Sequence, residues 1–261
     1  MVERVQSSDG TAIAYERSGS GSPVIVVGGA FNDRATAAPL ATELAGRFTV
    51  YTYDRRGRGD SGDTAPYAVV REVADLDALI RVAGGSAALY GVSSGAVLAL
   101  EAAAYGLPVS RLALFEPPIP MDAEGTHRPA AISAQLAELT SAGRNGDAVE
   151  LFMTRAVGLP AEAVAGMRQA PMWPGLEKMA PTLVYDTTIT EGVSWPDQRL
   201  AAVPVPALVV DSDASPDWLR TSARTLAGAL VNGRYRTLEG QFHEVPPAVL
   251  APALTEFFTS E

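Results

Sequence analysis

The sequence predicts an α/β fold: a mostly parallel central sheet with helices on both faces and a helical insertion. Short runs of β-branched and aromatic residues alternate with longer segments whose apolar residues recur at helical spacing, which predicts the sheet and its covering helices. This alternation stops after Pro117-Pro118 and resumes near Pro206, which predicts the insertion. A chain of 261 residues, of which 47% are hydrophobic and 19% charged, is long enough to build one such domain.

The first part of the chain supplies most of the predicted sheet. The strand at 11–17 follows Asp9-Gly10, a turn signal that predicts a hairpin. The run at 23–27 is continuously apolar and β-branched, as in a strand buried on both faces. Further strands are predicted at 48–53, 87–91 and 111–115, and helices at 34–45, 68–82 and 94–105.

The second part contains the insertion and the end of the sheet. Residues 121–203 are helical pieces separated by glycine and proline, with no clear strand. We therefore predict a core domain made of residues 1–120 and 204–261, and a helical lid made of residues 121–203. The core resumes with predicted strands at 206–210 and 234–238, and with helices at 216–230 and 246–259.

Composition excludes several classes of function. A net charge of −10 makes the chain a poor partner for nucleic acid or for an anionic membrane, although such a charge also simply favours solubility. The absence of cysteine excludes disulfides, thiolate metal sites and a cysteine nucleophile. Two distant histidines and scattered carboxylates lack metal-ligand spacing, so we predict no metal and no cofactor.

Targeting signals are not apparent in the sequence. The first ten residues have no apolar stretch typical of a secretory signal, and no apolar run approaches the roughly 18 residues of a membrane span. We expect a cytoplasmic protein whose partner is a small molecule. A homodimer stays an open alternative.

The segment Gly91-Val92-Ser93-Ser94-Gly95 fits the pattern G-x-S-x-G between a predicted strand and a predicted helix. Such a tight turn strains the backbone of the serine, and the glycines leave room for neighbouring chain. The helix that follows points its free N–H groups at the serine, where they favour developing negative charge. We predict Ser93 as a nucleophile; Ser94 comes one residue late for the glycine spacing. The alternative is a Gly/Ser-rich turn without chemistry.

A serine nucleophile needs a neighbouring base, and the chain has two histidines. His127 lies in a polar stretch at the start of the predicted lid. His243 lies in the loop after the strand at 234–238, at the same edge of the sheet as Ser93. We predict His243 as the base; the alternative is a loop histidine without a role.

Together these features resemble the α/β-hydrolase superfamily. The resemblance rests on the turn at 91–95, the loop from Tyr53 to Gly62, the Gly28-Gly29-Ala30 turn, the late loop with His243, and the chain order of nucleophile, acid and histidine. It implies the α/β-hydrolase fold, with the backbone N–H groups of Ala30 and Ser94 as oxyanion donors. Many relatives carry His-Gly where this chain has Gly28-Gly29.

The acid of the triad has two candidates. Relatives usually place an aspartate in the loop after the strand that here is 206–210, but aligned by its leading proline that position falls on Ser215, and Asp213 comes early. Glu116 directly follows the strand at 111–115, which resembles certain haloalkane dehalogenases and lactone hydrolases with the acid after that strand. We predict Glu116, with Asp213 as the alternative.

The composition of the insertion indicates what kind of substrate the protein binds. It holds five of the six methionines, together with Trp173 and Trp195, and such side chains adapt to apolar ligands. We predict Phe31, Met153 and Trp173 as substrate contacts; the alternative is that these methionines and tryptophans form a small apolar core of the lid. The arginines of the 54–62 loop are predicted to pair with nearby carboxylates.

These predictions converge on a serine hydrolase that cleaves a carboxylic ester or lactone of an apolar small molecule through an acyl-enzyme. Epoxide hydrolase or dehalogenase chemistry would favour aspartate at position 93. The alternatives are a non-hydrolytic enzyme of the same fold, such as a lyase or cyclase of natural-product metabolism, and a small-molecule binder.

Overall fold

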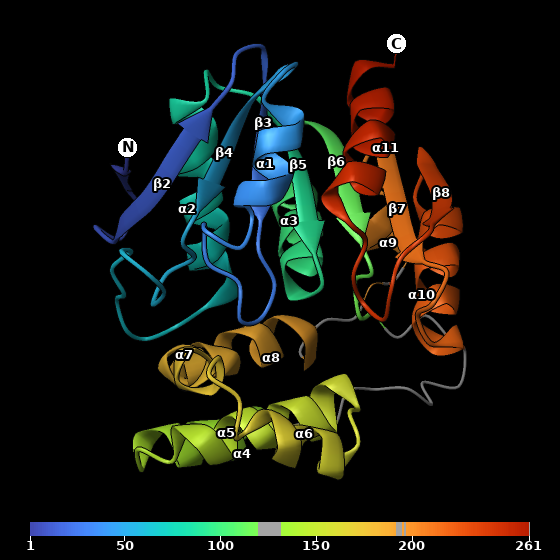
Figure 1. The fold of residues 1–261 in the computed structure, drawn as a ribbon. Coiled ribbons are helices and arrows are strands. Elements are labelled where there is room, and N and C mark those ends of the chain that lie inside the picture. The colour runs from blue at the N-terminus through green and yellow to red at the C-terminus, as the bar shows by residue number, and fades with distance from the viewer. Residues whose placement is uncertain (120–131, 192–194, 196, 261) are drawn as a thin grey trace.

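The computed structural model describes residues 1–119, 132–191, 195 and 197–260, and within them the chain forms an eight-stranded sheet (Figure 1). The strand order is β1-β2-β4-β3-β5-β6-β7-β8. The strands are β1 (Glu3–Gln6), β2 (Ala12–Ser18), β3 (Ser22–Val27), β4 (Phe48–Tyr53), β5 (Ala87–Val92), β6 (Val109–Phe115), β7 (Ala207–Ser212) and β8 (Gly233–Leu238). This architecture confirms the predicted fold class.

The sheet is parallel except at one edge. β1 pairs with β2, and β2 with β4, in antiparallel fashion, so the hairpin predicted after Asp9-Gly10 is confirmed. The remaining pairings, from β4 through β3 and on to β8, are parallel. The loops that follow β3, β5, β6, β7 and β8 therefore all leave the sheet at its carboxyl edge.

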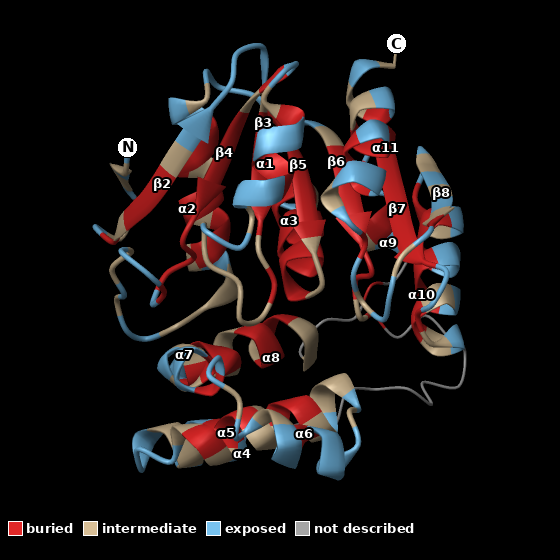
Figure 2. Cartoon of the chain, viewed as in Figure 1, coloured by how far each residue is buried: buried red, intermediate tan, exposed pale blue. Residues whose placement is uncertain are grey.

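Helices cover both faces of the sheet. The side chains of β3 alternate, so that Ile25 and Val27 join the apolar cluster under α2, α3 and α10, and Val24 and Val26 join the cluster under α1 and α11. In Figure 2 the central strands, β3 to β7, and the inner helix faces are accordingly mostly buried, whereas β8 at the edge of the sheet is largely intermediate or exposed. The covering helices are α1 (Ala38–Leu44), α2 (Val69–Val82), α3 (Ser94–Ala104), α10 (Asp217–Ala229) and α11 (Pro247–Thr259).

The first helix is shorter than predicted. It begins at Ala38, whereas the prediction was 34–45. Two hydrogen bonds hold the preceding residues in a turn: the Arg34 N–H donates to Asp54 Oδ1 (2.8 Å), and the Thr36 N–H donates to Asp33 Oδ1 (2.9 Å). Pro39 then suits the first helical turn, where its missing N–H has no partner to lose.

A helical insertion lies across the carboxyl edge of the sheet (Figure 1). Its described residues, 132–191, contain helices and no strand, as predicted, and α8 packs against α3 of the core. The predicted first residue of the lid, 121, lies outside the described residues. The elements are α4 (Ser133–Ser141), α5 (Asn145–Phe152), the π-helix η1 (Met153–Val157), α6 (Ala161–Met167), α7 (Trp173–Met179), the 3₁₀ turn η2 (Ala180–Thr182) and α8 (Leu183–Glu191), and α9 (Asp197–Leu200) leads back to the sheet.

Two glycines permit the turn from β5 into α3. A Cβ atom on Gly91 would lie 2.5 Å from the Gly95 carbonyl oxygen. One on Gly95 would lie 2.3 Å from the carbonyl oxygen of Val27 and 2.5 Å from that of Gly28. Since these neighbours are backbone atoms of α3, of the end of β3 and of the residue that follows it, they cannot move aside cheaply. The spacing of the glycines around Ser93 is thus set by close packing.

Gly95→Ala should lower the free energy of unfolding by about 1–3 kcal/mol or more, because the new methyl group overlaps backbone atoms at the end of β3. Urea unfolding followed by circular dichroism measures this. The matched control is Gly228→Ala in α10, where an added Cβ meets nothing within 4 Å and should stabilise the helix by about 0.5–1 kcal/mol. Equal destabilisation by both substitutions would show that the turn is not constrained by packing.

Candidate active site

Ser93 lies in a strained turn between β5 and α3. Its backbone angles are φ 55° and ψ −125°, a region that non-glycine residues rarely adopt. The Ser93 N–H donates to the Phe115 carbonyl (2.9 Å), which ties the turn to the end of β6. The first turn of α3 starts at the next residue, so its free N–H groups surround the serine.

Glu116 and His243 are in direct contact. Glu116 follows β6, is fully buried, and places Oε2 2.5 Å from His243 Nδ1. Its other oxygen, Oε1, accepts the Ser212 N–H (2.8 Å), which fixes the carboxylate from the adjacent strand β7. The backbone N–H of His243 donates to Ser215 Oγ (3.1 Å), so the main chain of this residue is held in place as well.

Asp213 forms its hydrogen bond with a different residue, Gly240. Its side chain accepts the Gly240 N–H at Oδ1 (3.0 Å), and the residue is exposed. It therefore braces the loop after β8, whereas Glu116 is the carboxylate that the structure joins to His243. His127 lies outside the described residues.

Backbone strain gathers at these positions. Within the described part of the chain, the non-glycine residues with positive φ are Phe31 (57°), Ser93 (55°), Glu116 (45°) and His243 (55°). Each follows a different parallel strand at the carboxyl edge of the sheet. Strained residues of this kind cluster at functional sites, where the surrounding structure holds them in place.

A pocket of about 240 Å³ opens above Ser93. Ser93, His243, Ala30 and Ser94 all line it, so the structure brings these predicted residues together. Phe31, predicted to contact substrate, lines it too and packs edge-on against Phe152 with the ring centroids 5.5 Å apart. The other apolar lining residues are Val92, Pro118, Phe152, Ala156, Val157, Trp218, Leu219 and Phe242.

Residues 19–249 match the family model described as the alpha/beta hydrolase family. The chain belongs to the alpha/beta hydrolase family. This confirms the resemblance found in the sequence.

Three known proteins resemble this alpha/beta hydrolase. A crystal structure of an alpha/beta hydrolase from Sphaerobacter thermophilus DSM 20745 is 55% identical, with a TM-score of 0.92, over 98% of this chain and 100% of that one. The enol-lactonase from Burkholderia xenovorans LB400 shares the fold, with a TM-score of 0.71 at 21% identity over 99% of this chain and 100% of that one. The uncharacterized hydrolase YraK of Bacillus subtilis (strain 168) is 34% identical over 96 residues, which is 35% of this chain and 35% of its own length.

In this alpha/beta hydrolase, two of the predicted substrate contacts lie elsewhere. Met153 and Trp173 are buried in the apolar cluster within the insertion and are not among the lining residues of the pocket. The Trp173 Nε1–H donates to Glu177 Oε1 (2.9 Å) in the next turn of α7. Their methionine and tryptophan side chains thus fill the core of the insertion, which is the alternative that the sequence left open.

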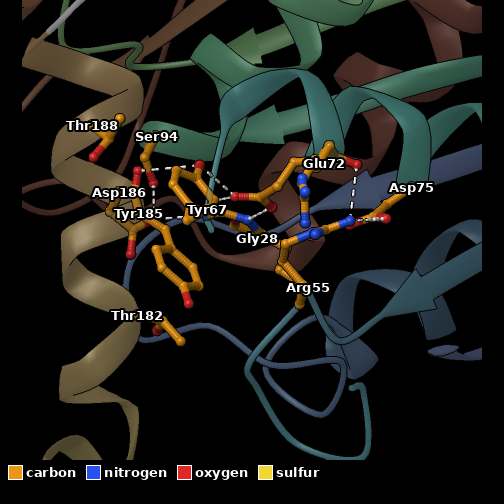
Figure 3. A network of polar contacts seen from close by, with 12 residues as sticks. Gly28, Arg55, Tyr67, Glu72, Asp75, Ser94, Thr182, Tyr185, Asp186 and Thr188 are labelled. Atoms are coloured by element: carbon orange, nitrogen blue, oxygen red, sulfur yellow. Dashed lines mark hydrogen bonds and ion pairs between the residues drawn. The ribbon is translucent and has the colours of Figure 1, made fainter. Parts of the chain in front are cut away.

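The arginines of the 54–62 loop pair with carboxylates, as predicted, and one partner comes from the insertion (Figure 3). Arg55 donates to Glu72 through Nε (2.7 Å) and Nη2 (2.6 Å), and to Asp186 Oδ1 through Nη1 (2.6 Å). Arg58 Nη2 donates to Asp186 Oδ2 (2.5 Å). The Ser94 hydroxyl donates to Asp186 Oδ1 (2.7 Å). The carboxylate on α8 therefore joins the arginine loop to the residue after the candidate nucleophile.

The network is almost fully buried, and its charges balance. Arg55, Glu72 and Asp186 are each at most 2% exposed. Burial alone would raise the pKa of Asp186, but the charges of Arg58 and Arg55 and the hydrogen bond from Ser94 outweigh it and hold the pKa below its usual value of 3.8. Asp186 therefore stays ionised at neutral pH.

Sequence reasoning missed Asp186, and it missed Asn32. Asn32 Oδ1 accepts the Gly29 N–H (2.9 Å) in the turn beside Ser93. Asp186 lies on a helix whose sequence has no motif, and its partner loop is more than 120 residues away, so no local spacing points to it. The one sequence signal for Asp186 was the cluster of three arginines in the 54–62 loop, because buried arginines need carboxylates as partners.

Within the described residues, no group of three or more histidine, cysteine or acidic side chains could hold a metal ion. None of the helices in the described part of the chain has the length and apolar character needed to cross a membrane.

Asp186→Asn should lower the free energy of unfolding by about 3–5 kcal/mol at neutral pH, because two buried guanidinium groups lose their shared counter-ion. Since the folded pKa of Asp186 is depressed, its stabilisation is complete above its unfolded value and is lost as the pH falls through the folded value. The difference between wild type and variant should be constant above about pH 5 and shrink in acid. Urea unfolding from pH 7 to pH 3 measures it, and a difference independent of pH would contradict an ionised Asp186.

Proposed function

We propose that this alpha/beta hydrolase is a serine hydrolase that cleaves a carboxylic ester or lactone of an apolar small molecule through an acyl-enzyme. The observation that carries the proposal is the contact of 2.5 Å between His243 Nδ1 and the buried Glu116, with His243 and the strained Ser93 lining one pocket. A general base that is itself oriented by a carboxylate is the arrangement that activates a serine hydroxyl.

In the first half of the reaction, Ser93 Oγ attacks the ester carbonyl while His243 Nε2 accepts the hydroxyl proton. Glu116 accepts the hydrogen bond from His243 Nδ1–H, which keeps Nε2 free as the base and stabilises the imidazolium that forms. The tetrahedral intermediate then collapses, its bond to the alcohol oxygen breaks, and His243 returns the proton to that oxygen. The acyl group stays on Ser93.

In the second half, water attacks the acyl-enzyme, His243 accepts a proton from the water, and the same proton returns to Ser93 Oγ as the carboxylic acid leaves. The backbone N–H groups of Ala30 and Ser94 are the proposed donors to the oxyanion in both steps. In support, neither N–H has a hydrogen-bond partner among the described residues, and both residues line the pocket beside Ser93.

The pocket favours small and uncharged substrates. Among the described lining residues there is no lysine or arginine, and the Asp186 carboxylate is already bound by Arg55, Arg58 and Ser94. A substrate carboxylate would lose its hydration there without gaining a cationic partner. A volume of about 240 Å³ lies below the usual range for drug-sized ligands, which supports a short acyl group or a small lactone ring.

Release of nitrophenol from nitrophenyl acetate and butyrate tests the proposal. Wild type should hydrolyse both, and Ser93→Ala should lose about 10⁴-fold or more in kcat/KM. The singly charged nitrophenyl hemisuccinate should be a much poorer substrate than the butyrate, which has a similar length. Absence of Ser93-dependent hydrolysis of esters and of small lactones would instead favour a non-hydrolytic enzyme or a binding protein.

Substitution of the two candidate acids separates their roles. Glu116→Gln should lower kcat by about 10³–10⁴-fold, because an amide can neither fix the required tautomer of His243 nor stabilise its charged form. Asp213→Asn should change kcat by less than about threefold, since Asp213 only braces Gly240. Nitrophenyl ester kinetics measure both variants, and the reverse pattern would move the acid role to Asp213.

A further inference from the structure

Asp186 contacts one of the two proposed oxyanion donors through its side chain. The Ser94 hydroxyl donates to Asp186 Oδ1 (2.7 Å), and the Ser94 backbone N–H, at the start of α3, is the proposed donor. The hydroxyl and the N–H belong to one residue, so a fixed side chain restrains the direction of its amide. Ser94 is 3% exposed, and this hydrogen bond is therefore not in competition with bulk water.

The same carboxylate reaches the other donor through Arg58. Arg58 Nη2 donates to Asp186 Oδ2 (2.5 Å), and Arg58 Nη1 donates to the carbonyl oxygens of Gly29 (2.6 Å) and Asn32 (3.2 Å). The Gly29 carbonyl and the Ala30 N–H are the two ends of one planar peptide group. A cationic donor on the carbonyl therefore fixes where the N–H points, and it polarises the amide so that the N–H becomes a stronger donor.

We propose that Asp186 of α8 is a positioning residue that orders both halves of the oxyanion site, acting on Ser94 directly and on Ala30 through Arg58. The proposal rests on the function proposed above and adds to it a role for the insertion. Asp186 belongs to the insertion, while Ser94 and Ala30 belong to the core. The insertion must be seated on the core for both amides to point correctly.

An uncharged side chain at position 186 could not take this role. Asp186 receives hydrogen bonds from Arg55, Arg58 and Ser94, so a single carboxylate links two separate segments of the core, the 54–62 loop and the start of α3. Arg55 Nη1 also donates to the Gly28 carbonyl (3.3 Å), and the following amide, Gly29 N–H, is bound by Asn32 Oδ1 (2.9 Å). Each peptide group on the path to Ala30 is thus held from the side of the arginine loop.

Ser94→Ala is the sharpest variant, because it keeps the backbone N–H and both arginine pairs and removes only the hydroxyl link to Asp186. The matched control is Ser222→Ala in α10, which removes another buried hydroxyl donor, to the Ile119 carbonyl, in a residue that does not line the pocket. With nitrophenyl butyrate, Ser94→Ala should lower kcat by about 10-fold, less than the 10²–10³-fold lost with a whole oxyanion donor. KM should change less than about twofold, and Ser222→Ala should leave both constants near wild type.

A second readout separates orientation of the donors from general loosening. A trifluoromethyl ketone adds to Ser93 and places an oxyanion at the two amides, whereas butyramide neither adds to Ser93 nor carries a charge. Ser94→Ala should weaken inhibition by the ketone about as much as it lowers kcat and leave inhibition by butyramide nearly unchanged. In the double variant with Asp186→Asn, the Ser94 substitution should have no further effect. Equal weakening of both inhibitors, or wild-type kcat in Ser94→Ala, would overturn the proposal.

Hydrogen exchange of the intact protein tests the link without relying on hydrolysis. Ser94→Ala should speed exchange in residues 94–97 alone, and Asp186→Asn should speed it in residues 28–32 as well, each relative to Ser222→Ala. Unchanged exchange in both segments would overturn the role of Asp186. If only the proposed function is wrong, the result is different: both variants then show the exchange effects given above, and the wild-type protein shows no Ser93-dependent hydrolysis.

Discussion

The strained turn at Ser93 is the constraint on which the site depends. A positive φ at a serine persists only where the surrounding structure leaves no relaxed alternative. Here β5 and α3 are buried on both sides, Gly91 and Gly95 bring the turn against the backbone of β3 and α3, and the Ser93 N–H is bound to the end of β6. The turn exposes the hydroxyl in a pocket and surrounds it with the free N–H groups of a helix.

Around this turn, the carboxyl edge of a parallel sheet brings distant parts of the chain together. Ala30 follows β3, Ser93 follows β5, Glu116 follows β6, and His243 follows β8. The insertion closes the pocket from the other side and is tied to the core by the charge-balanced network of Arg55, Arg58, Glu72 and Asp186. Removal of one member of such a network costs far more than its net contribution, because the remaining charges stay buried without a partner.

Much of this arrangement could be predicted from the sequence. Hydrophobic periodicity located strands β2 to β8 and the covering helices but assigned no residues to β1, and the G-x-S-x-G turn together with two histidines pointed to Ser93 and His243. The prediction from hydrophobic periodicity was wrong at the start of the first helix. There Asp54, a residue distant in sequence, accepts a hydrogen bond from the Arg34 N–H and keeps the chain in a turn. Composition could not say whether Met153 and Trp173 face a ligand or fill a core, because both uses favour the same apolar side chains. Asp186 depends on a contact between segments more than 120 residues apart, which no single sequence reveals.

The most direct test of the central claim, that Ser93 is an activated nucleophile, is covalent labelling with a fluorophosphonate followed by peptide mass spectrometry. One adduct per chain on Ser93, together with loss of labelling in His243→Ala, is the predicted result, because the hydroxyl needs its base to react. An adduct on Ser94 would contradict the account, as would labelling of Ser93 that is indifferent to His243 or the absence of any adduct on a folded protein.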